Sequence, residues 1–115
     1  MKLDCVKEKI TEGINRVEKT TGKNLNLPIL SCVLLKTDKN NLIIRSTNLD
    51  IGVEVSIPAK VHREGSVAVS GSILASFLAC VKNEKNITLE LVDGNLVIKT
   101  NSLSTTIKAQ SSEDF

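Results

Sequence analysis

The residue types that most often carry catalysis are scattered along this sequence. Cys5, Cys32 and Cys80 are far apart and form no C-x-x-C pair, and His62 is the only histidine. Only the fold could bring His62 beside a thiol, and a histidine among charged residues is more typical of a solvated loop. An odd number of cysteines in a chain that opens without a signal peptide is typical of reduced, buried thiols.

Motifs for nucleophilic, phosphate-transfer and glycosidase chemistry are missing. Gly71-Ser72 lies at a predicted strand-to-helix junction, but the local sequence is Ser-Gly-Ser rather than G-x-S-x-G. Neither the phosphate-binding loop nor the G-x-G-x-x-G dinucleotide motif occurs. Asp50 and Glu54 are four residues apart, which in a strand separates them by about 13 Å, too far for a retaining carboxylate pair. The sequence therefore argues against an enzyme and predicts neither a cofactor nor a metal site.

The composition is that of a globular domain with an aliphatic core. The 115 residues are 41% hydrophobic and 24% charged, with two phenylalanines and neither tyrosine nor tryptophan. Proteins that bind single-stranded nucleic acid usually stack bases on aromatic rings, so this composition disfavours that partner. No apolar run approaches the roughly 18 residues of a membrane span, and the first residues form no apolar signal segment. We therefore expect one domain over residues 1–115, in the cytoplasm and without a membrane partner.

The excess of positive charge is confined to the first 23 residues. Six Lys and Arg accompany four acids there, whereas the other 92 residues hold nine of each sign. Apolar residues in this segment repeat at spacings of 4, 4 and 3, which predicts a helix from Lys7 to about Gly22. Its other side carries a stripe of three cations and one acid: Lys9, Glu12, Arg16 and Lys19. The stripe is compatible with a nucleic-acid partner and equally typical of a solvated helix face.

The pattern of the first half, about residues 1–60, otherwise predicts strands. A hairpin turn is indicated at residues 38–41, and Pro58 is expected to end the last strand and to open a polar loop over residues 58–65. The predicted strands are residues 2–5, 31–37, 42–47 and 51–57.

The second half, about residues 61–115, repeats the same order of elements. Ser70 is a suitable N-cap for a helix over residues 72–82, and Asp93-Gly94 indicates a hairpin turn. The predicted strands are residues 67–69, 87–92, 95–100 and 103–109. Each half thus consists of strand, helix, strand, strand, strand. This duplication predicts an α+β fold in which two similar units place both helices on one face of antiparallel sheets.

The last strand of each unit is predicted to lie at a sheet edge. Residues 51–57 and 103–109 contain no internal proline, and each has at most one ionised residue, Glu54 or Lys108. Edges with so little protection suit pairing with another chain. The alternative is that each strand is already paired within the domain.

Short motifs at characteristic spacing resemble a known family. Leu-Pro-Ile-Leu at residues 27–30, Leu34-Leu35 and Thr-Asn-Leu-Asp at residues 47–50 are similar to the first domain of the bacterial DNA polymerase III β subunit, the sliding clamp. The opening Met-Lys-Leu, Gly22-Lys23 and the closing Asp114-Phe115 also fit, so the resemblance covers the entire chain. The duplicated β-α-β-β-β order is the architecture of that family, the DNA-clamp fold.

The resemblance implies a non-catalytic processivity factor. Members of this family have three such domains per subunit, and two subunits form a homodimer ring around duplex DNA, with helices lining the hole and sheets forming the outer wall. The ring tethers the replicative polymerase during DNA replication. Polymerase peptides bind between the second and third domains, so polymerase and clamp loader would act through domains that this sequence does not contain.

The resemblance also implies which residues contact DNA. Cations on the inner helices would attract phosphates without reading bases. The family often has basic residues at the positions of Asn24 and Ser72, and this sequence departs at both, with Lys23 beside the first. The DNA-contacting positions are Arg16, Lys19, Lys23, Asn24 and Ser72.

The subunit contact implied by the resemblance uses the last strand. That strand pairs edge to edge with a domain of the second subunit, through Ser104, Thr105, Thr106, Ile107 and Lys108, with Ile107 as the apolar anchor. Family members often have basic residues around this contact. In this sequence those positions are Ile73, Asn95, Ser102 and Ser104. Two other functions remain open from the residues: a protein-interaction module that uses the same edges without DNA, and an enzyme with a thiol site.

Overall fold

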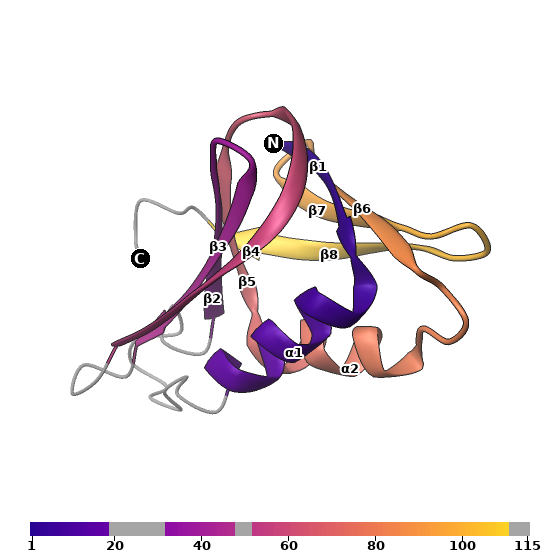
Figure 1. Cartoon of the computed structure of the whole chain (residues 1–115), viewed down its shortest axis with the longest axis horizontal. Helices are drawn as coiled ribbons and strands as arrows, with labels where there is room; N and C mark the ends of the chain where they lie inside the picture. The colour runs from indigo at the N-terminus through magenta and orange to yellow at the C-terminus, as the bar shows by residue number, and fades with distance from the viewer. Residues whose placement is uncertain (19–31, 48–51, 111–115) are drawn as a thin grey trace.

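The computed structural model describes residues 1–18, 32–47 and 52–110. The predicted end of the first helix near Gly22, Asp50, and the DNA-contacting candidates Lys19, Lys23 and Asn24 lie outside these residues. The elements are β1 (Lys2–Val6), α1 (Lys7–Glu18), β2 (Cys32–Asp38), β3 (Asn41–Thr47), β4 (Gly52–Arg63), β5 (Ser66–Ser70), α2 (Gly71–Cys80), β6 (Asn86–Val92), β7 (Asn95–Lys99) and β8 (Ser104–Gln110) (Figure 1). Within the described ranges, no helix is long and apolar enough to cross a membrane.

The predicted duplication of element order is confirmed. Strand, helix and three strands occur twice, and the order starts again between β4 and β5. Ser70 caps α2 as predicted, because its Oγ accepts a hydrogen bond from the backbone N–H of Ile73 at 3.3 Å. The turn at Asp93 and Gly94 has positive φ angles of 51° and 79°, which are those of a type I′ hairpin. Local cap and turn chemistry therefore sets the start of α2 and the turn between β6 and β7.

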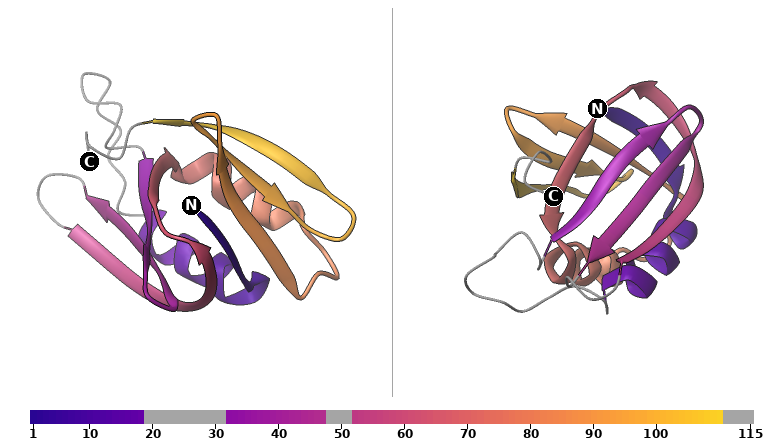
Figure 2. Two further views of the ribbon diagram at one scale, coloured as in Figure 1. Left: turned by 90° about the horizontal axis from the view of Figure 1, so that it is seen from above. Right: turned by 90° about the vertical axis from the view of Figure 1, so that its left-hand side faces the viewer.

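The eight strands form a closed antiparallel barrel rather than separate open sheets. The strand order around it is β1-β4-β3-β2-β5-β8-β7-β6 (Figure 2). Closure depends on β1, which pairs with β4 of its own half and with β6 of the other half. Helices α1 and α2 contact each other and lie side by side on one side of the barrel in every view. Both helices thus occupy the same face, as the sequence predicts.

The core is aliphatic, as the composition predicts. Inward-facing residues of the strands and the buried faces of both helices form one cluster, with Leu3, Ile14, Leu35, Leu78 and Leu89 all fully buried. Each such side chain contributes roughly 1.5–3 kcal/mol by its removal from water. The lack of a side chain at Gly13 lets α1 approach β3, since a Cβ there would lie 3.0 Å from Ile44 Cδ1.

The prediction of a polar loop from Pro58 onward is wrong, because β4 continues to Arg63. Ala59 N donates a hydrogen bond to Asn40 O at 3.0 Å. The backbone nitrogen of the preceding residue, Pro58, therefore points away from β3. A proline is tolerated at such a position, where the strand needs no hydrogen-bond donor. Beyond it, residues 59–63 leave β3 and pair with β1.

The two predicted edges are largely open on one side among the described strands. In β4, residues 52–58 pair with β3 and residues 59–63 with β1. In β8, residues 104–108 pair with β7, and only Ala109 and Gln110 pair with β5. Residue 109 is therefore paired inside the domain, contrary to the prediction, whereas residues 52–57 of β4 remain at an edge, as predicted. The first part of each strand has one neighbour among the described strands and an open second side.

Candidate functional site

The paired helices hold the two described candidates for DNA contact. Arg16 lies in the last turn of α1, with 66% of its side chain exposed, and Ser72 is exposed in the first turn of α2. Helix α1 forms because Ile10, Ile14 and Val17 fall on one buried stripe, which leaves Arg16 on the opposite, solvent-facing side. The fold thus brings both residues to the helical side of the molecule.

The charge on this helical side is balanced among the described residues. The Arg16 guanidinium binds Glu12 Oε1 at 2.6 Å, one helical turn earlier. Helix α2 contains no charged residue, and its first turn is not acidic. The charged residues of α1 are three cations and three acids: Lys7, Lys9, Arg16, Glu8, Glu12 and Glu18. Phosphate attraction by this surface therefore rests on few charges, and Arg16 is already paired.

The open edge of β8 presents backbone groups at alternate residues. Thr100 N donates to Leu103 O at 2.8 Å and closes the β7–β8 hairpin. Hydrogen-bonded and non-hydrogen-bonded pairs alternate along an antiparallel ladder. The backbone groups of Thr105 and Ile107 therefore bond to β7, and those of the even-numbered residues point away from β7. The residues whose backbone N–H and C=O groups face the open side are Ser104, Thr106 and Lys108, all exposed.

Ile107 does not fill the predicted role of apolar anchor on this edge. Its side chain points into the barrel, is 5% exposed and belongs to the core cluster. The alternation of β8 requires this, because Thr105 and Ile107 share the inner face. Ile73, in the first turn of α2, is instead 55% exposed. The pairing of β5 with β8 stops at Val69 and Ala109, shortly before this turn. Two exposed apolar residues therefore flank the edge: Leu103, 44% exposed, directly precedes Ser104, and Ile73 lies toward the Lys108 end.

Two further candidates lie at opposite ends of the β7–β8 hairpin. Asn95 is opposite Lys108 at the end of the ladder and is half-buried. Ser102, in the connection between the strands, donates from Oγ to Glu84 Oε1 at 2.8 Å. Ser102 is thus engaged within the domain, whereas Asn95 borders the open edge through Lys108.

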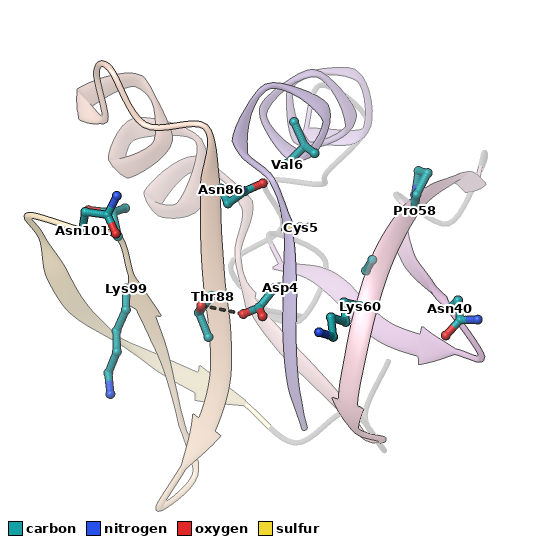
Figure 3. A pocket seen from close by; sticks show the side chains of 12 residues that line it. Asp4, Cys5, Val6, Asn40, Pro58, Lys60, Asn86, Thr88, Lys99 and Asn101 are labelled. Atoms are coloured by element: carbon teal, nitrogen blue, oxygen red, sulfur yellow. Dashed lines mark hydrogen bonds between the residues drawn. The ribbon is translucent and has the colours of Figure 1, made fainter.

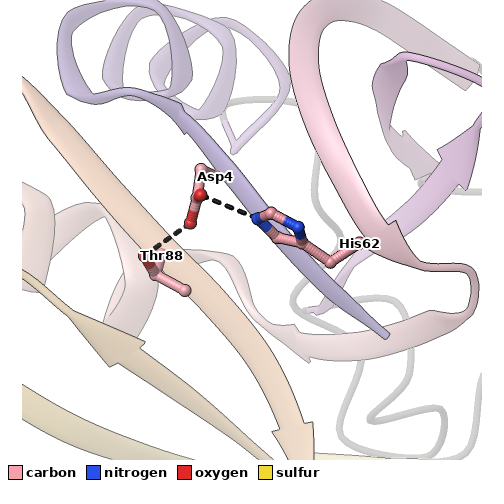
Figure 4. A network of polar contacts seen from close by, with 3 residues as sticks. All are labelled: Asp4, His62 and Thr88. Carbon is pink, nitrogen blue, oxygen red and sulfur yellow. Dashed lines mark hydrogen bonds and ion pairs between the residues drawn. The ribbon is translucent and has the colours of Figure 1, made fainter.

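A polar cluster that the sequence does not reveal joins three strands. His62 Nε2 lies 2.8 Å from Asp4 Oδ2, and Thr88 Oγ1 donates to Asp4 Oδ1 at 2.6 Å (Figure 4). The hydrogen bonds from His62 and Thr88 lower the pKa of Asp4 below its ordinary value of 3.8. His62 therefore belongs to a strand and has a partner, which corrects its prediction as a solvated loop residue. Asp4 is 58 positions from His62 and 84 positions from Thr88, so no local sequence pattern indicates these contacts.

A groove of about 840 Å³ crosses the outside of β1 (Figure 3). Its lining includes the polar residues Asp4, Lys60, Thr88 and Lys99. Cys5 also borders it, but burial raises the pKa of the Cys5 thiol to about 12. A thiol with this pKa is almost entirely protonated at neutral pH and is a poor nucleophile. The groove therefore does not supply the thiol chemistry that was left open from the sequence.

The cysteines differ from the prediction of three buried thiols. Cys5 and Cys32 are buried, with 5% and 2% exposure, but Cys80 is exposed at the end of α2. The position of Cys80 follows from helix geometry. Leu74 and Leu78 fill the buried stripe, and Cys80 lies on the other side.

Comparison with known proteins identifies one family along the whole chain. A family model described as "DNA polymerase III beta subunit, N-terminal domain" matches residues 1–115. The beta sliding clamp of Treponema pallidum is 31% identical over 117 residues, covering 100% of this chain and 31% of that protein. The beta sliding clamp of Synechococcus elongatus is 25% identical with the same coverage.

Solved structures agree with the sequence comparison. The Helicobacter pylori beta clamp in complex with carprofen matches with a TM-score of 0.92 and 25% identity, covering 100% of this chain and 31% of that one. This chain therefore spans about a third of the length of the relatives that it matches. With the family model matched from the first residue to the last and the duplicated barrel shared with solved clamps, the chain belongs to the DNA polymerase III β-subunit family, in the part that forms its N-terminal domain.

Proposed function

We propose that this chain is one domain of a sliding clamp, a ring that encircles duplex DNA and keeps the replicative polymerase on its template. The observation that carries the proposal is the placement of α1 and α2 side by side on one face of a duplicated barrel (Figure 1). A helical face of this kind can line a hole, while the strands form the outside. The family match along residues 1–115 supports the same function.

The helical face would contact phosphates without reading sequence. We assign this role to Arg16 and Ser72, and to Lys19, Lys23 and Asn24, which lie outside the described residues. Contacts between cations and phosphates are independent of base sequence and weaken with salt. Retention then depends on closure of the ring, and weak contacts leave the protein able to slide.

The open edge of β8 would join a domain of a second clamp subunit. Strand addition there uses the backbone groups of Ser104, Thr106 and Lys108, and Ile73 adds exposed apolar surface near them. The other predicted contact residues would support the edge indirectly. Thr105 and Ile107 hold β8 in the barrel, and Asn95 and Ser102 border the hairpin. The seam is largely uncharged, with Lys108 as its one cation.

The proposed partners beyond DNA and clamp subunits require other domains. The chain covers 31% of the relatives' length, so contacts with polymerase and clamp loader are assigned to the remainder of such a protein. The role is non-catalytic. It belongs in the cytoplasm, where bacterial duplex DNA lies.

Topological retention tests this function directly. The full-length protein that contains this chain is loaded on nicked circular DNA and followed by gel filtration. We expect it to stay on circular DNA through washing at raised salt and to leave when the DNA is cut once. Protein that dissociates equally from circular and linear DNA would contradict the ring.

A further inference from the structure

The groove outside β1 is a surface separate from the helical side and from the open edge of β8. Residues of β1, β4, β6 and β7 and of the turns beside them line its 840 Å³, and no described residue of α1 or α2 does (Figure 3). Its lining also includes none of the residues to which contact with DNA or with a second subunit is assigned. The groove therefore remains available when the helices line a hole.

One row of side chains crosses the groove from strand to strand. Asp4 of β1 lies opposite Lys60 of β4 on one side and opposite Thr88 of β6 on the other. Thr88 in turn lies opposite Lys99 of β7. Paired residues of antiparallel strands have Cα atoms about 5 Å apart, so the backbones of the two lysines are about 15 Å apart along the sheet. Their spacing is set by the strand register, with Asp4 between them (Figure 3).

The two lysines are free to bind an anion, whereas the carboxylate between them is already engaged. Lys60 and Lys99 are exposed, and neither forms an ion pair with a described residue. The two oxygens of Asp4 are held by Thr88 and His62, and these hydrogen bonds lower its pKa below 3.8. Asp4 is therefore ionised at neutral pH. The groove thus presents two cations separated by one fixed anion.

This order of charges favours a peptide over a nucleic acid. Residues four positions apart in an extended peptide point to the same side and lie about 13 Å apart, a distance that flexible lysine side chains can match. The residue midway between them would lie over Asp4, where a carboxylate is repelled and a hydroxyl can donate a hydrogen bond. A nucleic-acid strand carries a phosphate on every nucleotide, so it cannot leave the middle position uncharged.

We propose that this groove binds an extended segment of a partner protein with two acidic residues four positions apart and a serine or threonine midway between them. The two acidic side chains bind Lys60 and Lys99, and the segment runs across the strands. The exposed amides of Asn86 and Asn101 border the groove and can hydrogen-bond to the backbone of the segment. Ion pairs at exposed lysines are weak, so we expect a Kd on the order of 1 mM. The inference goes beyond the proposed function, which gives these residues no role.

Titration of the isotope-labelled 115-residue chain with synthetic heptapeptides, followed through its amide NMR shifts, tests the proposal. The probe has glutamate at its second and sixth positions, serine at its fourth, glycine elsewhere and both ends blocked. A control peptide of the same composition carries its two glutamates side by side. We expect the probe to shift the amides of β1, β6 and β7 in a saturable manner. The control should bind about fivefold more weakly, because it can reach only one lysine.

Variants of the chain test the role of each charge. Lys60→Glu and Lys99→Glu should each weaken probe binding at least about fivefold, and Lys60→Gln and Lys99→Gln should give smaller losses. Lys36→Glu is the matched control, since Lys36 is exposed on β2 and does not line the groove, and it should bind the probe like the wild type. Well-dispersed amide signals in the same spectra show that each variant is folded.

A third peptide, with glutamate also at the fourth position, tests the carboxylate between the lysines. Despite its extra charge it should bind the wild type no better than the probe does, and it should gain affinity with Asp4→Asn. This gain would not be expected if the groove attracted anions only through its net charge.

Three results would overturn the proposal: unshifted groove amides at the highest probe concentration, equal binding of the probe and the side-by-side control, or full binding to Lys60→Glu and Lys99→Glu. A short DNA duplex that shifts the same amides at a lower concentration than the probe would assign the groove to nucleic acid and overturn it as well. None of these results bears on retention of the full-length ring on circular DNA, so failure here is distinguishable from failure of the proposed function.

Discussion

His62 Nε2 and Asp4 Oδ2 lie 2.8 Å apart and connect β4 to β1 on the outside of the barrel (Figure 4). Thr88 extends the connection to β6, so one carboxylate bridges strands of both halves. The bridge lies at the place where β1 closes the barrel, which gives Asp4 a measurable role in stability.

Replacing Asp4 by Asn should destabilise the domain at neutral pH. The pKa of Asp4 is lower in the folded chain than in the unfolded chain, chiefly through the hydrogen bond with His62. Its contribution is therefore present above the unfolded pKa and disappears as pH falls through the folded pKa, below the ordinary value of 3.8. Both side chains are about 40% exposed, so solvent screening limits the loss to at most about 1 kcal/mol. Urea unfolding of wild type and Asp4→Asn from pH 7 to pH 2 should show curves that converge in acid. A difference that persists at pH 2 would assign the loss to packing instead.

Prolines at two neighbouring positions of β8 should distinguish backbone N–H groups that face the open side from those that bond to β7. Thr106 directs its N–H to the open side, so Thr106→Pro should leave the barrel folded and impair subunit contact in the full-length protein. Thr105 directs its N–H to β7, so Thr105→Pro removes a ladder hydrogen bond and should cost about 1–3 kcal/mol of stability. Thermal melting and analytical ultracentrifugation measure the two effects. Equal destabilisation by both prolines would contradict the assigned register.

Glu12 should weaken the interaction of Arg16 with DNA. Exposed pairs of this kind are worth only about 0–1 kcal/mol, so a phosphate can compete with Glu12 for the guanidinium. In the full-length protein, Glu12→Gln should strengthen DNA binding, and Arg16→Gln should abolish that gain while lowering the salt slope by about 0.9. Fluorescence anisotropy with a duplex at several salt concentrations gives both quantities. If Glu12→Gln acts equally in the presence and absence of Arg16, the effect belongs to net charge and not to this pair.

Cys80 should be the thiol that reacts first in the native chain. It is exposed, whereas Cys5 is buried and has its pKa raised to about 12. With iodoacetamide at pH 8, mass spectrometry should detect rapid labelling at Cys80 and labelling of Cys5 and Cys32 only after denaturation. Rapid native labelling of Cys5 would show that β1 opens or that its thiol is activated.

Local patterns in the sequence were sufficient for the order of elements. Ser70, the turn at Asp93-Gly94 and the apolar stripe of α1 each act within a few residues, so their effects can be predicted from neighbouring positions. Pro58 was misleading because proline usually ends a strand, whereas here its nitrogen faces a side that needs no donor.

Closure of the barrel could not be predicted in this way. It depends on pairs such as Leu3 with Leu89, which are distant in sequence and leave no periodic signal. The same limitation affects the candidate site. The alternation in β8 would have put Ile107 inside the barrel, but only the pairing with β7 and β5 shows which side of the strand is open. The bridge from Asp4 to His62 and Thr88 has the same long-range origin.

The double pairing of β1 has a consequence for synthesis on the ribosome. Residues 2–6 leave the exit tunnel before the other strands of this domain, but their partner β6 ends at Val92. The nascent chain must therefore keep β1 unpaired on that side until most of the domain has been translated. Helices and the β2–β3 hairpin can form early, whereas the final cylinder can close only late. A translational pause before Val92 would therefore prolong the exposure of an unpaired apolar strand, and truncated products that end before this point should be recognised by chaperones.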